Sequence, residues 1–218
     1  MQLTFSAILV NSKYAAGTMA LALILALSPL SMSNAMHHAG GDTDGNGNGE
    51  AKTAAKAQIA LAEQMIDAFY SFDAQQLAPL LTQAPDSATR ILYYQGWAKG
   101  GNYIVLNRAP CAVEDANKIA CAITVQDDPV QALKTGFDVT DTFHLTFEGT
   151  TIVAVDTSSN DEPIYFEARK WVEANRPEVM TGPCKDRNAG GTTPVACAQA
   201  MTQGYKAFYE AVVAPRSQ

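Results

Sequence analysis

The spacing of the apolar side chains changes at Gly100-Gly101, and this change limits the folds open to the chain. Before these glycines, apolar residues recur every three or four positions, as in helices with one buried face. After them, from Tyr103 to Val155, apolar and polar residues alternate, as in strands with one buried face. Helices followed by strands predict an α+β domain, with the helices packed on a curved antiparallel sheet.

The sequence predicts three helices before the glycines, over residues 54–70, 74–82 and 87–99. In the third helix, Tyr94 and Trp97 share one face by helical spacing, and Tyr93 flanks them. Aromatic side chains at this spacing belong to a core more often than to a binding site. The three residues are nevertheless the candidates for lining a ligand cavity.

Four strands are predicted after the glycines, over residues 103–113, 118–126, 138–147 and 151–155. One face of the third strand is polar and carries Thr140, Thr142, His144 and Thr146. Asp141 falls on the opposite, apolar face, together with Val139 and Phe143. It is the candidate catalytic base, because burial raises the pKa of a carboxyl group toward neutrality. The alternative is that Asp141 faces water at the frayed start of its strand.

Two further helices are predicted beyond the strands, separated by a loop over residues 182–193. The first begins near Asn160-Asp161 and stops before Arg176-Pro177, because the residue before a proline resists helical geometry. The second opens at Thr193-Pro194 and keeps a helical repeat as far as Val212.

The first 35 residues have the pattern of a signal peptide. Lys13 is their only charge, the apolar run Ala20–Leu30 follows it, and Ser33-Asn34-Ala35 supplies the small residues of a cleavage site. The run is shorter than the roughly 20 residues of a membrane span. We expect cleavage after Ala35 and a periplasmic or extracellular protein with no membrane attachment; retention of the leader as an anchor is the alternative.

The four cysteines, Cys111, Cys121, Cys184 and Cys197, all follow this leader. An even number of cysteines in an exported chain favours disulfides, and C-x-x-C metal spacing is absent. Four cysteines allow three pairings. A hairpin centred on Ala116 would set Cys111 opposite Cys121, which favours that pair and leaves Cys184 to bridge Cys197.

Residues 36–55 have the Gly, Asn and Asp content of a flexible linker. Five of them match positions of a calcium loop: Asp42, Asp44, Asn46, Gly47 and Glu50. The position that needs a bidentate Glu is Thr53, so we predict no calcium site. A mature start at Met36-His37-His38 could hold Cu(II) or Ni(II) adventitiously, and we assign no metal or cofactor.

The acidic net charge of the chain limits the partners that it can bind. The 218 residues carry a net charge of −7, and their 15 basic residues form no positive stripe. Nucleic acids and anionic membranes are therefore excluded as partners.

We divide the chain into a signal peptide (1–35), a linker (36–55), an α+β domain (56–156) and a helical extension packed on the same domain (157–218).

The segments AEQMIDAFYSFDAQQLAPLL and DVTDTFHLTFEGTTIVAV, with this order of elements, resemble the nuclear transport factor 2-like superfamily, which includes ketosteroid isomerase and the SnoaL-like polyketide cyclases. The resemblance covers about residues 57–155 and implies helices on a cone-shaped sheet that encloses a pocket. Two departures affect the mouth of that pocket: residues 83–86 leave no room for the usual strand between the second and third helices, and a disulfide-linked extension is added. Met65 stands where the isomerases have their tyrosine, and no residue matches their general base, so the resemblance implies the scaffold and not an activity.

Three functions stay open on the sequence. The chain could bind a small apolar ligand or a protein partner, or it could be a proton-transfer enzyme of isomerase or cyclase type that uses Asp141 as its base. It could also be a structural module that forms a homodimer through the polar face of the sheet. A buried Asp141 beside a tyrosine would favour the enzyme, an apolar cavity without ionisable groups would favour the binding protein, and a filled core would favour the structural module.

Overall fold

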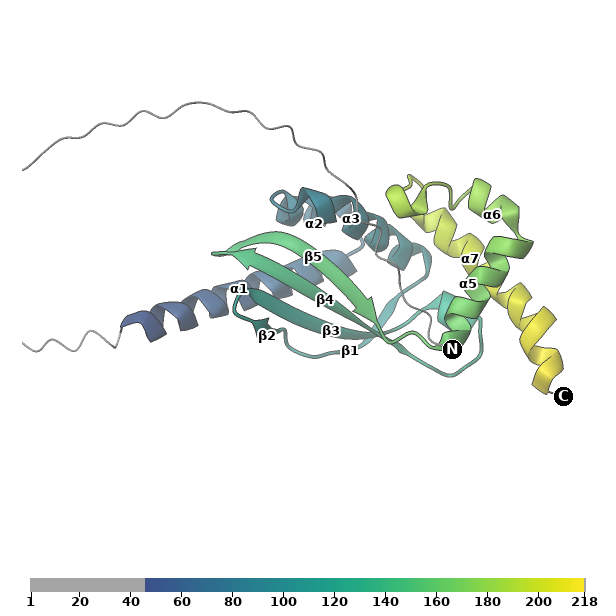
Figure 1. Cartoon of the computed structure of the whole chain (residues 1–218), viewed down its shortest axis with the longest axis horizontal. Helices are drawn as coiled ribbons and strands as arrows, with labels where there is room; N and C mark the ends of the chain where they lie inside the picture. Colours follow the sequence, from purple (N-terminus) through teal and green to yellow (C-terminus); the bar gives the residue numbers. More distant parts are fainter. Residues whose placement is uncertain (1–45, 218) are drawn as a thin grey trace, which may run out of the picture. The chain divides into compact units, whose positions relative to one another are not determined.

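The computed structural model describes residues 46–217, and every element named below belongs to this part of the chain. Helices come first: α1 (Asn46–Tyr70), α2 (Ala74–Leu77), the 3₁₀ turn η1 (Ala78–Leu81) and α3 (Pro85–Gly100). The strands are β1 (Ile104–Arg108), β2 (Ala112–Asp115), β3 (Lys118–Gln126), β4 (Val139–Glu148) and β5 (Thr151–Ser159). A short helix, α4 (Asp128–Gln131), separates β3 from β4. The predicted α+β class is confirmed (Figure 1).

The C-terminal part is helical, as predicted. Its elements are α5 (Pro163–Asn175), α6 (Pro177–Thr181), the 3₁₀ turn η2 (Arg187–Ala189), α7 (Pro194–Phe208), the π turn η3 (Tyr209–Val213) and the 3₁₀ turn η4 (Ala214–Ser217). The sequence did not predict α6, which starts at Pro177, a residue whose fixed φ suits a first helical turn. Between residues 46 and 217, no helix is both long and apolar enough to cross a membrane.

The first helix begins at Asn46 instead of Ala54, so the prediction of a linker is wrong for residues 46–55. Gly47 and Gly49 lower helix propensity and suggested a linker, yet the helix continues through them. Positions 46–53 of the calcium-loop match are therefore helical. The predicted leader, residues 36–45 and the Met36-His37-His38 start lie outside the described residues.

The five strands form one antiparallel sheet in the order β1-β3-β4-β5, and β2 also pairs with β3. β1 and β2 pair with successive parts of β3: Val105 lies opposite Val125, and Ala112 lies opposite Ala120. The prediction of one continuous strand over residues 103–113 is therefore wrong. The strand breaks around Pro110, which has no N–H group to donate to the ladder.

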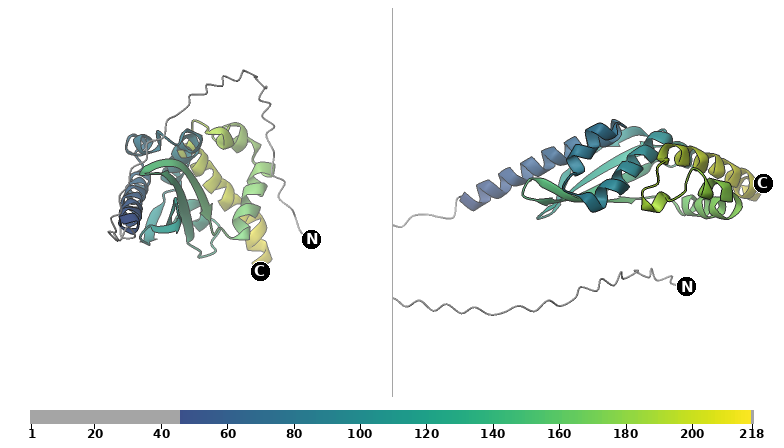
Figure 2. Two further views of the ribbon diagram at one scale, coloured as in Figure 1. Left: turned by 60° about the vertical axis from the view of Figure 1, so that its left-hand side comes forward. Right: turned by 90° about the horizontal axis from the view of Figure 1, so that it is seen from above.

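Helices α1 and α3 cover one face of the sheet, and α5–α7 lie beyond the ends of the strands (Figure 2). The core between helices and sheet includes Phe69 and Phe143, whose ring centroids are 4.8 Å apart. Asp141 faces the same side as Phe143, as predicted, and is buried. The polar side chains of β4 on the other face are half-buried: Thr140, Thr142, His144 and Thr146.

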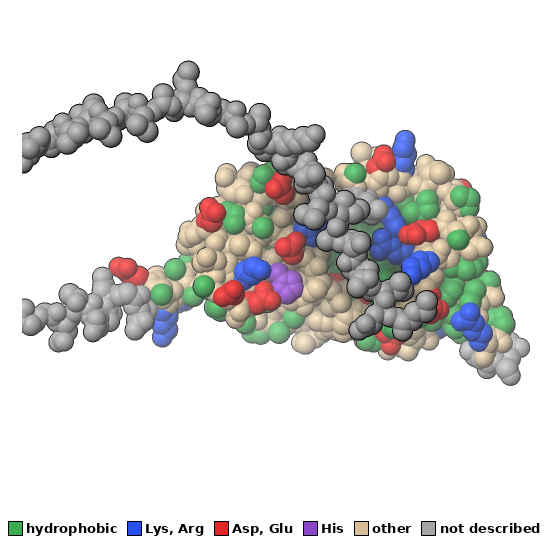
Figure 3. Space-filling view, in the orientation of Figure 1, with side chains coloured by type: hydrophobic (Ala, Val, Ile, Leu, Met, Phe, Trp, Pro, Cys, Tyr) green, Lys and Arg blue, Asp and Glu red, His purple; other side chains and the backbone are tan. Residues whose placement is uncertain are grey.

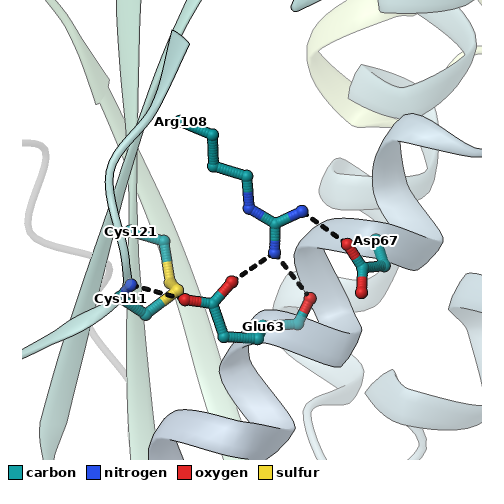
Figure 4. The surroundings of a disulfide bond; sticks show 5 residues. All are labelled: Glu63, Asp67, Arg108, Cys111 and Cys121. Atoms are coloured by element: carbon teal, nitrogen blue, oxygen red, sulfur yellow. Dashed lines mark hydrogen bonds and ion pairs between the residues drawn. A yellow bond between two sulfur atoms is a disulfide. The ribbon is translucent and has the colours of Figure 1, made fainter.

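A charged cluster ties α1 to the sheet edge, and we call it the Glu63 latch (Figure 4). Arg108 donates to the carboxylates of Glu63 and Asp67, and the Cys111 N–H donates to Glu63 Oε1 at 2.6 Å. Cys111 is bridged to Cys121, as predicted, because the β2–β3 register places the two residues opposite each other. The latch therefore fixes the broken edge strand both covalently and electrostatically.

The second predicted disulfide, Cys184–Cys197, joins the loop after α6 to the first turn of α7. Helix α7 also passes very close to α3, since a Cβ added to Gly100 would lie 2.4 Å from the Val195 carbonyl oxygen. No larger residue fits at that crossing. The C-terminal helices are thereby held against α3, which is the helix that carries the predicted aromatic residues.

Candidate functional site

A cavity of about 400 Å³ lies between α3, the sheet and the C-terminal helices. All four sequence-predicted residues line it: Tyr93, Tyr94 and Trp97 from α3, and Asp141 from β4. The aromatic residues of α3 therefore belong to both the core and a cavity wall. Arginine side chains also line the cavity, and Lys and Arg side chains gather beside the C-terminal helices in Figure 3.

Asp141 is buried and hydrogen-bonded inside this cavity. It is 4% exposed, and it pairs with Ile123 and Ser159 in the ladder, so it does not lie at a frayed strand end. The Tyr94 hydroxyl donates to Asp141 Oδ2 at 2.5 Å. Burial raises the pKa of Asp141 to about 6, and the hydrogen bond from Tyr94 opposes part of this shift. Asp141 is thus an ionised but relatively basic carboxylate at neutral pH.

Tyr94 is held in place by its aromatic neighbours. Its ring stacks on Phe143 at 6.0 Å and contacts Phe69 at 5.1 Å and Tyr103 at 6.3 Å. Burial raises its pKa well above the ordinary value, and the nearby Tyr103 and Asp141 add to the shift. Tyr94 therefore remains a hydrogen-bond donor and fixes the orientation of the Asp141 carboxylate.

A second buried carboxyl group, Asp127, lines the same cavity. It is 2% exposed and caps α4 by accepting a hydrogen bond from the Val130 N–H at 2.8 Å. Burial raises the pKa of Asp127 to about 7, against the lowering effect of that bond, and Asp141 raises it further by charge repulsion. Aspartates before a proline are ordinary turn and cap residues, so no sequence signal revealed the burial of Asp127.

The C-terminal part adds polar groups that the sequence did not predict. Asp161, just after β5, accepts a hydrogen bond from the Ser159 hydroxyl at 2.5 Å, and burial raises its pKa. Tyr165 of α5 and Tyr205 of α7 meet edge to face, with ring centroids 5.3 Å apart. The Tyr205 hydroxyl is buried and accepts a hydrogen bond from Tyr165, but its own O–H has no acceptor among the described residues, so this O–H remains available to a ligand.

The arginines around the cavity already have anionic partners. Arg90 pairs with Asp156 at 2.9 Å. Arg169 and Arg187 both pair with Glu173, at 3.5 and 2.5 Å. Arg169 and Arg187 share the single Glu173 carboxylate, and neither they nor Arg90 form an ion pair with Asp127 or Asp141.

His144 lies on the opposite face of β4 from Asp141, outside this acidic centre. Its Nδ1 lies 2.9 Å from Glu114 Oε2, and its Nε2 lies 2.9 Å from the Ser158 hydroxyl. The imidazole is thus held from both sides on the sheet surface. Over residues 46–217, no group of three or more His, Cys, Asp and Glu side chains could hold a metal ion.

The α+β class that the sequence predicted is present, and the nuclear transport factor 2-like resemblance stays a prediction. Helices cover a sheet beside a cavity, η1 leads to α3 without an intervening strand, and Met65 is packed in the core. Comparisons of the chain with protein-family models, curated proteins and solved structures found no match.

Proposed function

We propose that the cavity binds a small molecule and that Asp141 transfers a proton to or from it. The observation that carries this proposal is the 2.5 Å hydrogen bond between Tyr94 and Asp141, inside a cavity of about 400 Å³. A carboxylate buried beside a tyrosine was the feature expected to distinguish an enzyme from a simple binding protein or a structural module. A cavity of this volume is in the range of small-molecule sites.

The two carboxyl groups suit the two halves of a proton shift. Asp141, with a pKa of about 6, can accept a proton from a C–H group next to a carbonyl. Asp127, with a pKa of about 7, is partly protonated at neutral pH and can return a proton at another atom of the same molecule. The net reaction is an isomerisation that consumes and releases no proton, so no cofactor is required.

Two observations beyond the site support the wider proposal of an exported protein of the nuclear transport factor 2-like kind. Both cysteine pairs form disulfides, which persist mainly in oxidising compartments. The order of helices, sheet and cavity is the one that the resemblance implies. Dimerisation through the polar face of β4 stays a prediction.

The test is proton exchange at carbon. The full chain would be incubated in D2O with a small ketone, 4,4-dimethylcyclohexanone, and with its charged isostere, N,N-dimethyl-4-oxopiperidinium, and deuterium uptake beside the carbonyl would be followed by proton NMR. We expect uptake faster than in buffer for at least one ketone, and a loss of about 100-fold in Asp141→Asn. Asp156→Asn is the matched control, because Asp156 is an exposed acid at the rim.

Equal uptake with protein and with buffer alone, for both ketones, would contradict proton transfer. Acceleration that survives unchanged in Asp141→Asn would contradict the assignment of the base. Circular dichroism and thermal melts of each variant would verify that the fold is retained.

A further inference from the structure

We infer that the molecule bound in this cavity carries a positively charged amine, held by Asp127 and Asp141 among aromatic rings. This inference rests on the proposed function only in that the cavity is a small-molecule site. It adds the class of ligand, an organic ammonium ion, which the proton-transfer proposal leaves open.

Two buried carboxyl groups, Asp127 and Asp141, share the cavity without a basic partner. Asp141 is hydrogen-bonded by Tyr94, and Asp127 by the Val130 N–H, and the part of the chain that the structure describes gives neither an ion pair. Burying an unpaired carboxylate is costly, and two of them also repel each other. A cation placed between them would remove both costs.

The basic residues at the cavity contact other acids and not Asp127 or Asp141. Arg90 is paired with Asp156, and Arg169 and Arg187 are paired with Glu173. These pairs are partly exposed, and none of the three arginines forms an ion pair with the two buried acids. A ligand can therefore supply the charge that balances the acids.

The aromatic side chains that line the cavity also favour a cation. Aromatic rings surround the acids: Tyr94, Trp97, Tyr103, Tyr165 and Tyr205 all line the cavity. Ring faces attract organic cations, and this attraction is larger in desolvated sites. In this cavity, the carboxylates would balance the charge of an amine, and the ring faces would attract it further.

A separate observation also indicates a ligand. Tyr205 is fully buried and lines the cavity; its hydroxyl accepts a hydrogen bond from Tyr165, and its own O–H has no acceptor among the described residues. A buried donor without an acceptor is rare in folded proteins and calls for a ligand or a water molecule. A polar substituent on the amine, such as the carbonyl group of the proposed substrate, would satisfy it.

An anionic ligand fits these residues less well. Asp127, Asp141 and Asp161 would all repel it, and the arginines are already paired. A bare divalent metal ion is also disfavoured, because over residues 46–217 no cluster supplies three metal-ligating side chains. An ammonium ion needs no such cluster, since rings and two carboxylates can stabilise it.

Binding should depend on pH in one direction. A cation prefers ionised carboxylates, so its affinity should rise as the pH passes through the raised pKa values of Asp141 and Asp127, about 6 and about 7, and level off above them. Binding should release protons in the same range. The titratable and charged groups that face the two acids from the surrounding elements are Tyr70, Arg90, Tyr94, Tyr103, Asp128, Asp161, Tyr165, Arg169, Arg187 and Tyr205.

The experiment compares two probes that differ in one atom. The full chain would be titrated by calorimetry at pH 5 and pH 8 with N,N-dimethyl-4-oxopiperidinium and with 4,4-dimethylcyclohexanone, in which carbon replaces the charged nitrogen. At pH 8 we expect the cation to bind about tenfold more tightly than the neutral ketone, and this preference to disappear at pH 5. The cation has a permanent charge, so only the protein titrates.

Substitutions of single aspartates test which residues cause the preference for the cation. Asp127→Asn keeps a side chain that can cap α4, and it should lower the preference for the cation severalfold. Asp115→Asn is the matched control, because Asp115 is exposed on β2, does not line the cavity and should leave the preference unchanged. Equal binding of the two probes at pH 8, or a preference that Asp127→Asn and Asp141→Asn leave unchanged, would overturn the inference.

The two proposals can fail separately. If both ketones exchange protons but bind equally, proton transfer stands and the ammonium inference fails. If the cation binds preferentially but neither ketone exchanges, the ammonium inference stands and proton transfer fails.

Discussion

Carboxylates occur in two very different settings in this protein, the Glu63 latch and the cavity. In the latch, Glu63 and Asp67 are partly exposed, share one arginine, and stand beside a disulfide. In the cavity, Asp127 and Asp141 are almost fully buried and have no basic partner in the described residues. A paired carboxylate at an edge is explained by stability, whereas a buried unpaired one opposes stability and is better explained by a ligand or a reaction.

The largest expected effect is loss of the latch disulfide. The double variant Cys111→Ser/Cys121→Ser should lower the free energy of unfolding by about 3 kcal/mol, because the bridge closes a short loop in the unfolded chain. Chemical denaturation of the oxidised wild type and the variant would measure it. Cation binding at the cavity should persist at temperatures where the variant stays folded; loss of binding in the folded variant would show that the two regions are not separate.

Removing a buried carboxyl group from the cavity is expected to raise the free energy of unfolding, not lower it. Asp127 has a raised pKa in the folded state, so the stability it contributes is full below pH 4 and is lost as the pH rises to about 7. Asp127→Asn should therefore raise the free energy of unfolding at pH 8 by on the order of 2 kcal/mol and flatten its dependence on pH. Denaturation curves between pH 4 and pH 8 test this. A variant less stable than wild type at pH 8 would mean that Asp127 is structural, like the latch acids.

A smaller effect is expected for the latch arginine. Arg108→Met removes the partner of Glu63 and Asp67 and should cost about 1 kcal/mol, because the pairs are partly exposed to water. Arg176→Met is the matched control, since its partner Glu178 lies in an exposed pair and its loss should be nearly neutral. Urea denaturation at low and high salt would compare the two variants. Equal losses in the free energy of unfolding would show that the latch stabilises the fold no more than an ordinary surface ion pair does.

The smallest stability effect is expected at Tyr205. Tyr205→Phe removes the acceptor of the Tyr165 hydrogen bond together with a buried O–H that has no acceptor of its own; because these two losses offset each other, the free energy of unfolding should stay within about 0.5 kcal/mol of wild type. Affinity for N,N-dimethyl-4-oxopiperidinium should fall about threefold if the hydroxyl binds its carbonyl. Thermal melts and calorimetry separate the two effects; a clear loss of stability would show that the hydrogen bond from Tyr165 outweighs the cost of the buried O–H.

The sequence predicted the parts of the site that depend on local periodicity. Alternation along β4 is a property of the strand alone, and it placed Asp141 on the buried face. Helical spacing likewise placed Tyr94 and Trp97 on the wall of the cavity. The disulfide between Cys111 and Cys121 followed from the register of one hairpin.

The missing parts depend on contacts between distant segments. Asp127 looks like an ordinary helix cap in the sequence, and its burial depends on segments that are distant along the chain. Asp161 and Tyr205 come from the C-terminal part, whose position over α3 no local pattern encodes. The early start of α1 was missed for a related reason, since glycines lower local propensity without forbidding a helix.

The central claim is that Asp127 and Asp141 are buried, unpaired carboxyl groups that meet in one cavity. The most direct test is a carbon-13 NMR titration of the aspartate side-chain carboxyl carbons, assigned with Asp127→Asn and Asp141→Asn. The account predicts two groups that titrate at about 6 and about 7 in the free protein, and that shift to lower pH when N,N-dimethyl-4-oxopiperidinium is added. Ordinary titration of both groups near pH 4, unchanged by the cation, would contradict it.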